Sequence, residues 1–225
     1  TPDPENILLS RGPRMRLSAD MIRDQALFVS GLLREKIGGP SVKPYQPEGL
    51  WKEIASETKY ERAKGADLYR RSLYTFWKRT GPAPVMMTLD ASKRDVWVVT
   101  RERTSPPLPA CVLLNGPQFI EAARVMGQVM LKKHGENVDA MVVEMFRRLT
   151  SRVPTDRERE ILVRGFAEQL AYFQADPKRA EVFLKTGKAP VEKTLPAARI
   201  AAAAMVVNTL MNFDECVTKL SLIHI

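Results

Sequence analysis

The sequence predicts an all-α fold, a mainly helical and irregular multi-helix domain with one long packed loop. Hydrophobic residues make up 44% of the 225 residues, which is enough for a sizeable core. Only 7% of the residues are aromatic while Met reaches 10, a balance that suits helix packing better than sheets. Capped segments with apolar residues at helical spacing recur along the chain, whereas alternating strand patterns do not.

Three helices are expected in the first third of the chain. Ser18 is a suitable N-cap for a helix over residues 18–36, which the Gly-Gly-Pro stretch at 38–40 would end. A short helix is expected over residues 48–57, because Pro suits the position just before it. A third helix over residues 66–78 would gather its aromatic side chains on one face.

The middle of the chain contains the long loop. Residues 85–109 show no helical period. Val96 to Val99 looks extended, but an isolated strand without a partner would be marginally stable. We therefore expect a packed loop, and a short strand at residues 96–99 stays open as an alternative.

Five helices are expected in the second half, each at a recognised start signal. They begin at the turn 115–117, at Asn137, at Thr155, at Asp176-Pro177 and at Pro196. The first reaches Lys133, the fourth Lys185, and the last is a long Ala-rich helix to Lys219. Thr155 also forms a capping box with Glu158.

The charge balance favours, but does not single out, polyanionic partners. The 35 Lys and Arg against 26 Asp and Glu give +9. Acidic residues are interspersed among the basic ones, which is typical of a solvated mixed surface, so nucleic acid is not the expected partner. No membrane span is expected, since the longest apolar stretch, residues 200–210, is shorter than the ~20 residues required.

No catalytic or cofactor motif is recognisable. Cys111 and Cys216 are isolated, so the chain has neither a C-x-x-C-H haem attachment motif nor a metal-type cysteine pair. We expect buried thiols, or one disulfide if the two segments meet in space. His134 ends a predicted helix beside two lysines, where a histidine is typically a C-terminal cation. Catalytic residues stay unknown, no metal site is expected, and enzyme activity is left undecided.

Two groups of side chains are candidate ligand-binding residues. Arg70, Tyr74 and Lys78 would share one face of the 66–78 helix by their i, i+4 spacing, a face suited to a carboxylate, sugar or phosphate. The alternative is that their stems cover the helix's own apolar side.

The second group involves buried amides. Asn208 and Asn212 lie in an apolar helix and need polar partners, either in a structural network or at a ligand site. We expect this side to pack against residues 85–115, with Arg101, Arg103 or Asn115 among the partners.

Three phrases carry a family resemblance: RLSADMIRDQAL (16–27), PYQPEGLW (44–51) and YRRSLYTFW (69–77). With shorter matches they extend over residues 6–219. The sequence resembles the planctomycete-specific C-terminal domain of unknown function that is associated with planctomycete cytochrome c proteins. The resemblance implies a helical domain in a large exported or periplasmic protein, with haem c carried by another domain.

The resemblance also implies a domain division. This chain would be a fragment, the C-terminal portion of a domain that begins upstream of Thr1, comprising residues 1–219. Residues 220–225 do not continue the pattern and look like a translated sequencing adaptor.

Three functional hypotheses remain. The leading one is a binding or scaffolding module of an exported, cytochrome c-linked multidomain protein, whose partners are other domains of the same chain, a cytochrome c-like domain among them. The enzyme alternative is part of a redox or carbohydrate-active pocket that the upstream sequence completes. Nonspecific polyanion binding depends only on the net charge.

Overall fold

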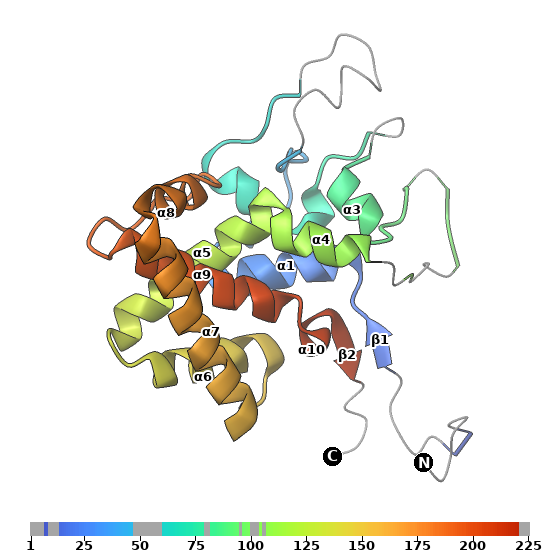
Figure 1. The fold of residues 1–225 in the computed structure, drawn as a ribbon. Helices are drawn as coiled ribbons and strands as arrows, with labels where there is room; N and C mark the ends of the chain where they lie inside the picture. Colours follow the sequence, from blue (N-terminus) through green and yellow to red (C-terminus); the bar gives the residue numbers. More distant parts are fainter. Residues whose placement is uncertain are drawn as a thin grey trace.

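The computed structural model describes residues 7–8, 14–46, 60–78, 82–94, 96–99, 104 and 107–220. Within these residues the chain is mainly helical, which confirms the predicted all-α class (Figure 1). The α-helices are α1 (Ala19–Ser30), α3 (Pro84–Thr88), α4 (Leu108–Asn115), α5 (Pro117–His134), α6 (Val138–Thr150), α7 (Asp156–Ala175), α8 (Pro177–Leu184), α9 (Ala197–Met211) and α10 (Asp214–Val217).

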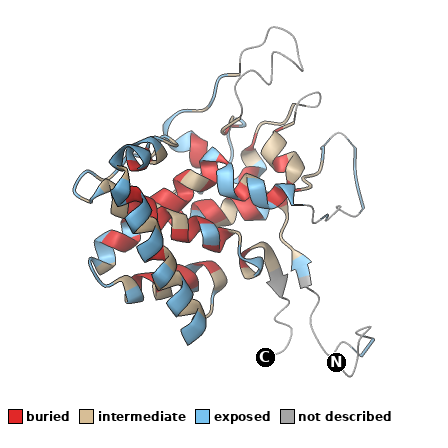
Figure 2. Cartoon of the chain, viewed as in Figure 1, coloured by how far each residue is buried: buried red, intermediate tan, exposed pale blue. Residues whose placement is uncertain are grey.

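Helix α9 lies at the centre of the molecule and packs against α5, α7 and α8. Figure 2 shows most of it in the buried colour. Its four consecutive alanines, Ala201–Ala204, are fully buried. Because alanine is small, α5 approaches α9 closely: a Cβ atom on Gly127 would lie 3.0 Å from the Ala204 nitrogen. The other side of α5 joins α6 in a core rich in methionine.

Helix α1 begins as predicted and ends earlier. The Ser18 side chain accepts a hydrogen bond from the Met21 N–H, which confirms the N-cap. The prediction that the helix reaches residue 36 is wrong. Gly31 adopts a left-handed conformation with φ of 77°, and its N–H returns to the carbonyl of Phe28, so the helix closes there.

The predicted helix over residues 66–78 is also wrong. The chain forms two 3₁₀ turns, η1 (Gly65–Tyr69) and η2 (Ser72–Tyr74), separated by Arg70, which is extended, and Arg71. Arg70 makes a parallel bridge with Arg34, and Thr75 makes one with Val42. These long-range backbone bonds replace the local bonds of an α-helix, so tertiary contacts override the aromatic helical pattern.

The 85–109 segment is less irregular than expected, because α3 occupies its start and α4 its end. Residues 96–99 form no strand, so the short-strand alternative is wrong, and Trp97 is 91% exposed. Asp90 anchors part of the segment by accepting hydrogen bonds from Arg16 and from the Thr104 N–H. The short helix predicted over residues 48–57 lies outside the described residues.

The starts of the later helices are confirmed. Asn137 caps α6, and Thr155 and Glu158 form the predicted capping box of α7. Asp176 caps α8, which ends at Leu184. Pro196 is the N-cap of α9 rather than a residue of its first turn.

The last helix does not reach Lys219. It ends at Met211, because Phe213 is extended and packs its ring 6.1 Å from that of Phe146. After α10 the chain forms β2 (Thr218–Leu220), which pairs antiparallel with β1 (Arg14–Arg16) and brings Leu220 opposite Arg14. Residues 221–225 lie outside the described residues, so their origin as an adaptor stays a prediction. Within the described residues, every helix is too short or too polar to cross a bilayer.

The two cysteines lie in different environments and are both free. Cys111 is exposed on α4, contrary to the expectation of two buried thiols, whereas Cys216 is buried on α10. Burial raises the pKa of the Cys216 thiol to about 12, and the neighbouring Glu215 charge adds to the rise.

A thiol reagent such as Ellman's should therefore distinguish the two cysteines. We expect Cys111 to react rapidly in the folded protein. Cys216 should react only after unfolding, because its raised pKa leaves on the order of a thousandfold less thiolate than an ordinary thiol has. Counting released thiolate with and without denaturant tests this. Two equally fast thiols in the folded protein would contradict the burial of Cys216.

Candidate functional site

A hollow of about 900 Å³ lies along the outward face of α1. We call it the α1 groove and define it by six of its lining residues: Met21, Asp24, Phe28, Glu35, Leu73 and Arg94. The helix, the segment that follows it, η2 and the segment after α3 all contribute to its walls. It is thus assembled from parts of the chain far apart in sequence.

The groove exposes apolar side chains. Ile22 and Ala26 bury the inward face of α1 in the core. On the outward face, Met21 is 52% exposed and Phe28 is 68% exposed, two helical turns apart. Leu73 of η2 is 66% exposed in the same hollow. Apolar residues from two elements therefore meet at one surface, which is typical of an interaction site.

The charged side chains of the groove are mostly paired. Arg94 lies 3.5 Å from an Asp20 carboxylate oxygen, and Arg71 lies 3.5 Å from one of Asp24. Glu35 is exposed and has no ion pair among the described residues. With three carboxylates and two guanidiniums in its lining, the groove is locally acidic on a chain whose net charge is +9.

The wall of the groove rests on a buried arginine of α1. Arg23 is 2% exposed and donates to the carbonyls of Leu68 at 3.0 Å and Arg70 at 2.9 Å. It also donates to the Gln118 side chain at 3.0 Å and the Ser72 hydroxyl at 3.2 Å. Burial lowers the pKa of this guanidinium. Arg23 thus holds the 68–72 segment, and with it Leu73, against α1.

The Asp24 carboxylate, next to Arg23 on α1, accepts a hydrogen bond from a backbone N–H. The donor is the Ser72 N–H at the start of η2, at 2.7 Å. Asp20 and Asp24 are therefore engaged in holding neighbouring groups. This arrangement suits a binding surface better than proton transfer, which needs a carboxylate directed at a substrate.

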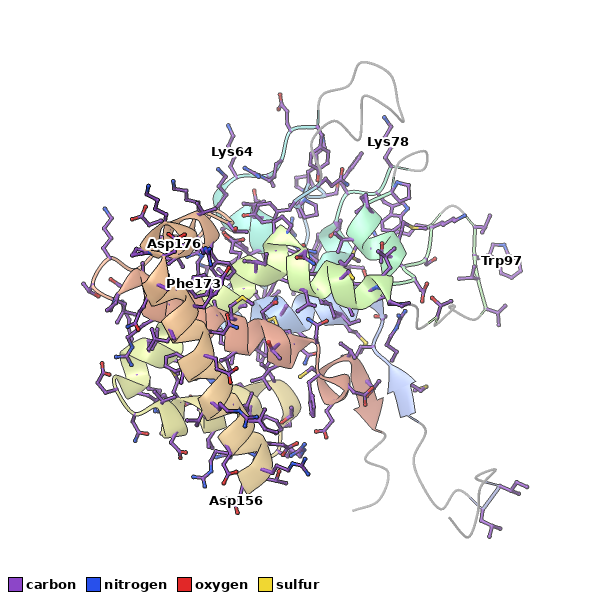
Figure 3. The ribbon with its side chains drawn as sticks, viewed as in Figure 1. Lys64, Lys78, Trp97, Asp156, Phe173 and Asp176 are labelled. Atoms are coloured by element: carbon purple, nitrogen blue, oxygen red, sulfur yellow. The ribbon has the colours of Figure 1, made fainter. Side chains whose placement is uncertain are left out.

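Arg70 and Tyr74 do come together, although no helix places them. The Arg70 guanidinium lies 3.9 Å from the centre of the Tyr74 ring. Arg70 is buried and donates to the carbonyls of Lys36 at 3.0 Å and Pro40 at 2.9 Å, so it holds the 36–40 loop. Lys78 points away from the packed helices (Figure 3). The predicted helix face shared by Arg70, Tyr74 and Lys78 is wrong, because residues 66–78 form no α-helix.

The predicted packing of Asn208 and Asn212 against residues 85–115 is confirmed in part. Asn208 is buried and donates to the Leu113 carbonyl at 3.0 Å, within the predicted 85–115 segment. Asn212 donates to the Asn208 carbonyl of its own helix, and Asn115 to the Cys111 carbonyl. The partners are backbone groups, and Asn115 is exposed rather than paired with them. Arg101 and Arg103 lie outside the described residues.

Sequence reasoning missed a second buried polar cluster. Glu121 of α5 is 1% exposed and accepts hydrogen bonds from the Lys188 and Ala189 N–H groups and from the Tyr69 hydroxyl. Arg124, one turn later, donates to the Ala189 carbonyl at 2.7 Å. Burial raises the pKa of Tyr69, and the Glu121 charge adds to this rise.

The two side chains clamp the 187–190 loop from one helix. Their i, i+3 spacing on α5 is a local signal, but the matching loop lies more than sixty residues away. The signal in the sequence is that Glu121 and Arg124 lie among the apolar residues of α5, because charged groups buried there need polar partners.

A scan against protein-family models matches residues 1–166 of the chain to PSD1, described as a protein of unknown function (DUF1553). The match covers 166 of the 225 residues and includes α1, the α1 groove and the start of α7. Searches of curated proteins and of solved structures found no match to the chain.

Proposed function

The chain belongs to the PSD1 family of proteins of unknown function (DUF1553), and because membership assigns no activity, we propose a function from the α1 groove. The domain is a binding module. Its groove takes an apolar segment of a partner protein that carries a basic residue beside its apolar side chains.

The observation that carries this proposal is the exposure of Met21, Phe28 and Leu73 within one hollow. Met21 and Phe28 lie seven residues apart and so face the same side of α1. A row of this kind offers contacts to a second helix or to an extended segment laid along it. Burying a side chain such as Phe28 contributes roughly 1.5 to 3 kcal/mol, so three such contacts can hold a peptide.

The charges that line the α1 groove favour a basic partner. The Arg71 and Arg94 charges are offset by Asp24 and Asp20, which leaves Glu35 as the carboxylate of the groove without an ion pair among the described residues. A Lys or Arg of the partner can approach Glu35, whereas an acidic partner would be repelled. The net charge of +9 would by itself favour an acidic partner, whereas the groove favours a basic one, so an experiment can distinguish the two.

The test uses two labelled helical peptides of Leu and Ala, one with Lys and one with Glu at the polar positions. By fluorescence anisotropy we expect the Lys peptide to bind about fivefold more tightly, equivalent to ~1 kcal/mol for an exposed pair. Phe28→Ser should weaken binding about tenfold or more, because it removes the most exposed apolar contact. Glu35→Lys should reverse the preference between the peptides.

Val182→Ser is the matched control. Val182 is 66% exposed on α8, outside the groove, so this variant should bind like the original chain. Both substitutions are at exposed sites and should leave the free energy of unfolding within about 0.5 kcal/mol. Equal loss of binding in Phe28→Ser and Val182→Ser, or tighter binding of the Glu peptide, would overturn the proposal.

The family resemblance supplies a more specific hypothesis about the partner. We propose that the segment belongs to another domain of the same exported chain, with a cytochrome c-like domain as the candidate. Reading the complete gene tests this, because a C-x-x-C-H motif and an export signal are required.

A further inference from the structure

A second hollow, of about 560 Å³, lies where the end of α5 meets α6. We call it the α5–α6 corner and define it by its charged lining: Lys133, His134, Glu144, Arg147 and Arg148. It is lined by residues of these two helices, unlike the α1 groove. The net charge of its lining is positive, unlike that of the α1 groove, since three of these side chains are permanent cations and one is a carboxylate.

Lys133, His134 and Arg148 all contact the Glu144 carboxylate. Lys133 Nζ lies 2.7 Å from Glu144 Oε2, and His134 Nε2 lies 2.6 Å from the same oxygen. Arg148 donates to Glu144 Oε1 at 2.8 Å. Hydrogen bonds from Lys133, His134 and Arg148 lower the pKa of Glu144 to about 2. The carboxylate thus marks a position where an oxyanion is bound by three side chains at once.

Glu144 does not neutralise the corner. Lys133, Arg147 and Arg148 carry three positive charges against one negative charge, which leaves two in excess without counting His134. Arg147 lines the hollow, is exposed, and has no ion pair among the described residues. Its neighbour Arg148 uses donors on Glu144, yet each guanidinium has five N–H groups, so further donors remain for a ligand.

We propose that the α5–α6 corner binds a tetrahedral oxyanion group, a phosphate or a sulfate. Arg147 and Arg148 supply the planar donor sets that match tetrahedral oxyanions, and Lys133 supplies a point charge. Glu144 holds Lys133 and Arg148 together. A bound oxyanion would share these two cations with Glu144 and contact Arg147 directly. This site is independent of the peptide-binding proposal, since its residues lie outside the α1 groove.

Titration of the full chain with inorganic phosphate and with sulfate, at constant ionic strength set by chloride, tests this site. Amide shifts in ¹⁵N NMR spectra should locate the change at residues 133–148. Arg147→Ala should raise the Kd about tenfold, as expected for loss of hydrogen bonds to a charged group. Glu144→Gln keeps an acceptor for the cations but removes the competing charge, so it should lower the Kd.

Arg164→Ala is the matched control, because Arg164 is an exposed arginine of α7 outside the corner and its loss changes the net charge equally. We expect it to leave the Kd unchanged. An equal rise in Kd for Arg164→Ala and Arg147→Ala would show general charge attraction and overturn the proposal, as would an absence of shifts at residues 133–148.

O-phosphoserine and a sulfated monosaccharide then serve as the two ester probes. The ester that binds more tightly identifies the source of the oxyanion group, and failure of both to compete with the inorganic ion would identify the free ion as the ligand.

Discussion

Replacing Arg23 by alanine is expected to lower the free energy of unfolding by about 3 to 5 kcal/mol. The side chain is buried and supplies hydrogen bonds to two backbone carbonyls, of Leu68 and Arg70, and to Ser72 and Gln118. Alanine leaves all four acceptors without their donor in a site that water cannot easily reach. Urea unfolding followed by circular dichroism at 222 nm, where helix signal is strong, measures the loss.

Arg34→Ala is the control for Arg23→Ala. Arg34 is exposed, and its backbone bridge to Arg70 does not need the side chain. Its replacement should change the free energy of unfolding by no more than about 0.5 kcal/mol. If Arg23→Ala behaves like this control, the buried network is not what holds the 68–72 segment in place.

Gly187→Ala is expected to destabilise the protein by about 2 to 4 kcal/mol, for two separate reasons. Gly187 has φ of 92°, a backbone conformation that residues with a side chain rarely adopt. A Cβ atom there would also lie 2.5 Å from the Glu121 carboxylate, which is buried and held by the same loop. The added methyl group must therefore displace either the loop or the carboxylate. Thermal and urea unfolding both report the loss.

Gly165→Ala is the matched glycine control and should have the opposite sign. Gly165 lies inside α7, and a Cβ atom would meet nothing within 4 Å. Alanine is favoured over glycine in a helix by about 0.8 to 1 kcal/mol, so this variant should be more stable.

A double-mutant cycle separates the two causes at Gly187. In a Glu121→Ala background the clash is absent and only the backbone strain remains, so Gly187→Ala should cost less than it does alone. If Gly187→Ala lowers the free energy of unfolding equally in both backgrounds, the whole loss comes from the backbone strain at φ of 92°.

The elements that the sequence predicts well are those with local signals. The capping box of Thr155 and Glu158 and the Asn137 cap act within four residues, and they place α6 and α7 correctly. Segment 66–78 has an equally clear aromatic period, yet it forms 3₁₀ turns. Its backbone bonds go to residues about thirty positions away, and no local pattern reports such partners.

The candidate sites also differ in whether the sequence alone predicts them. Asn208 was predicted to meet the 85–115 segment because a buried amide must find a partner, and it does so at Leu113. The α1 groove could not be predicted, since it depends on the position of Leu73 relative to Phe28, which tertiary contacts set. The i, i+4 pair Glu144 and Arg148 was visible in the sequence, but the approach of Lys133 and His134 required the turn between α5 and α6.

The alanines of α9 and the methionines of α5 and α6 give two parts of the core different abilities to adjust to a change in side-chain volume. An alanine side chain has no rotamers to lose, so ordering Ala201–Ala204 costs no side-chain entropy. For the same reason this interface cannot adjust to a larger neighbour by changing a torsion angle, and the helices themselves must move apart. The buried methionines of α5 and α6, Met126, Met130, Met141 and Met145, are unbranched and can change conformation. A larger side chain beside the methionines is therefore accommodated by their torsion angles, whereas one at the contact of α5 and α9 has to push the two helices apart.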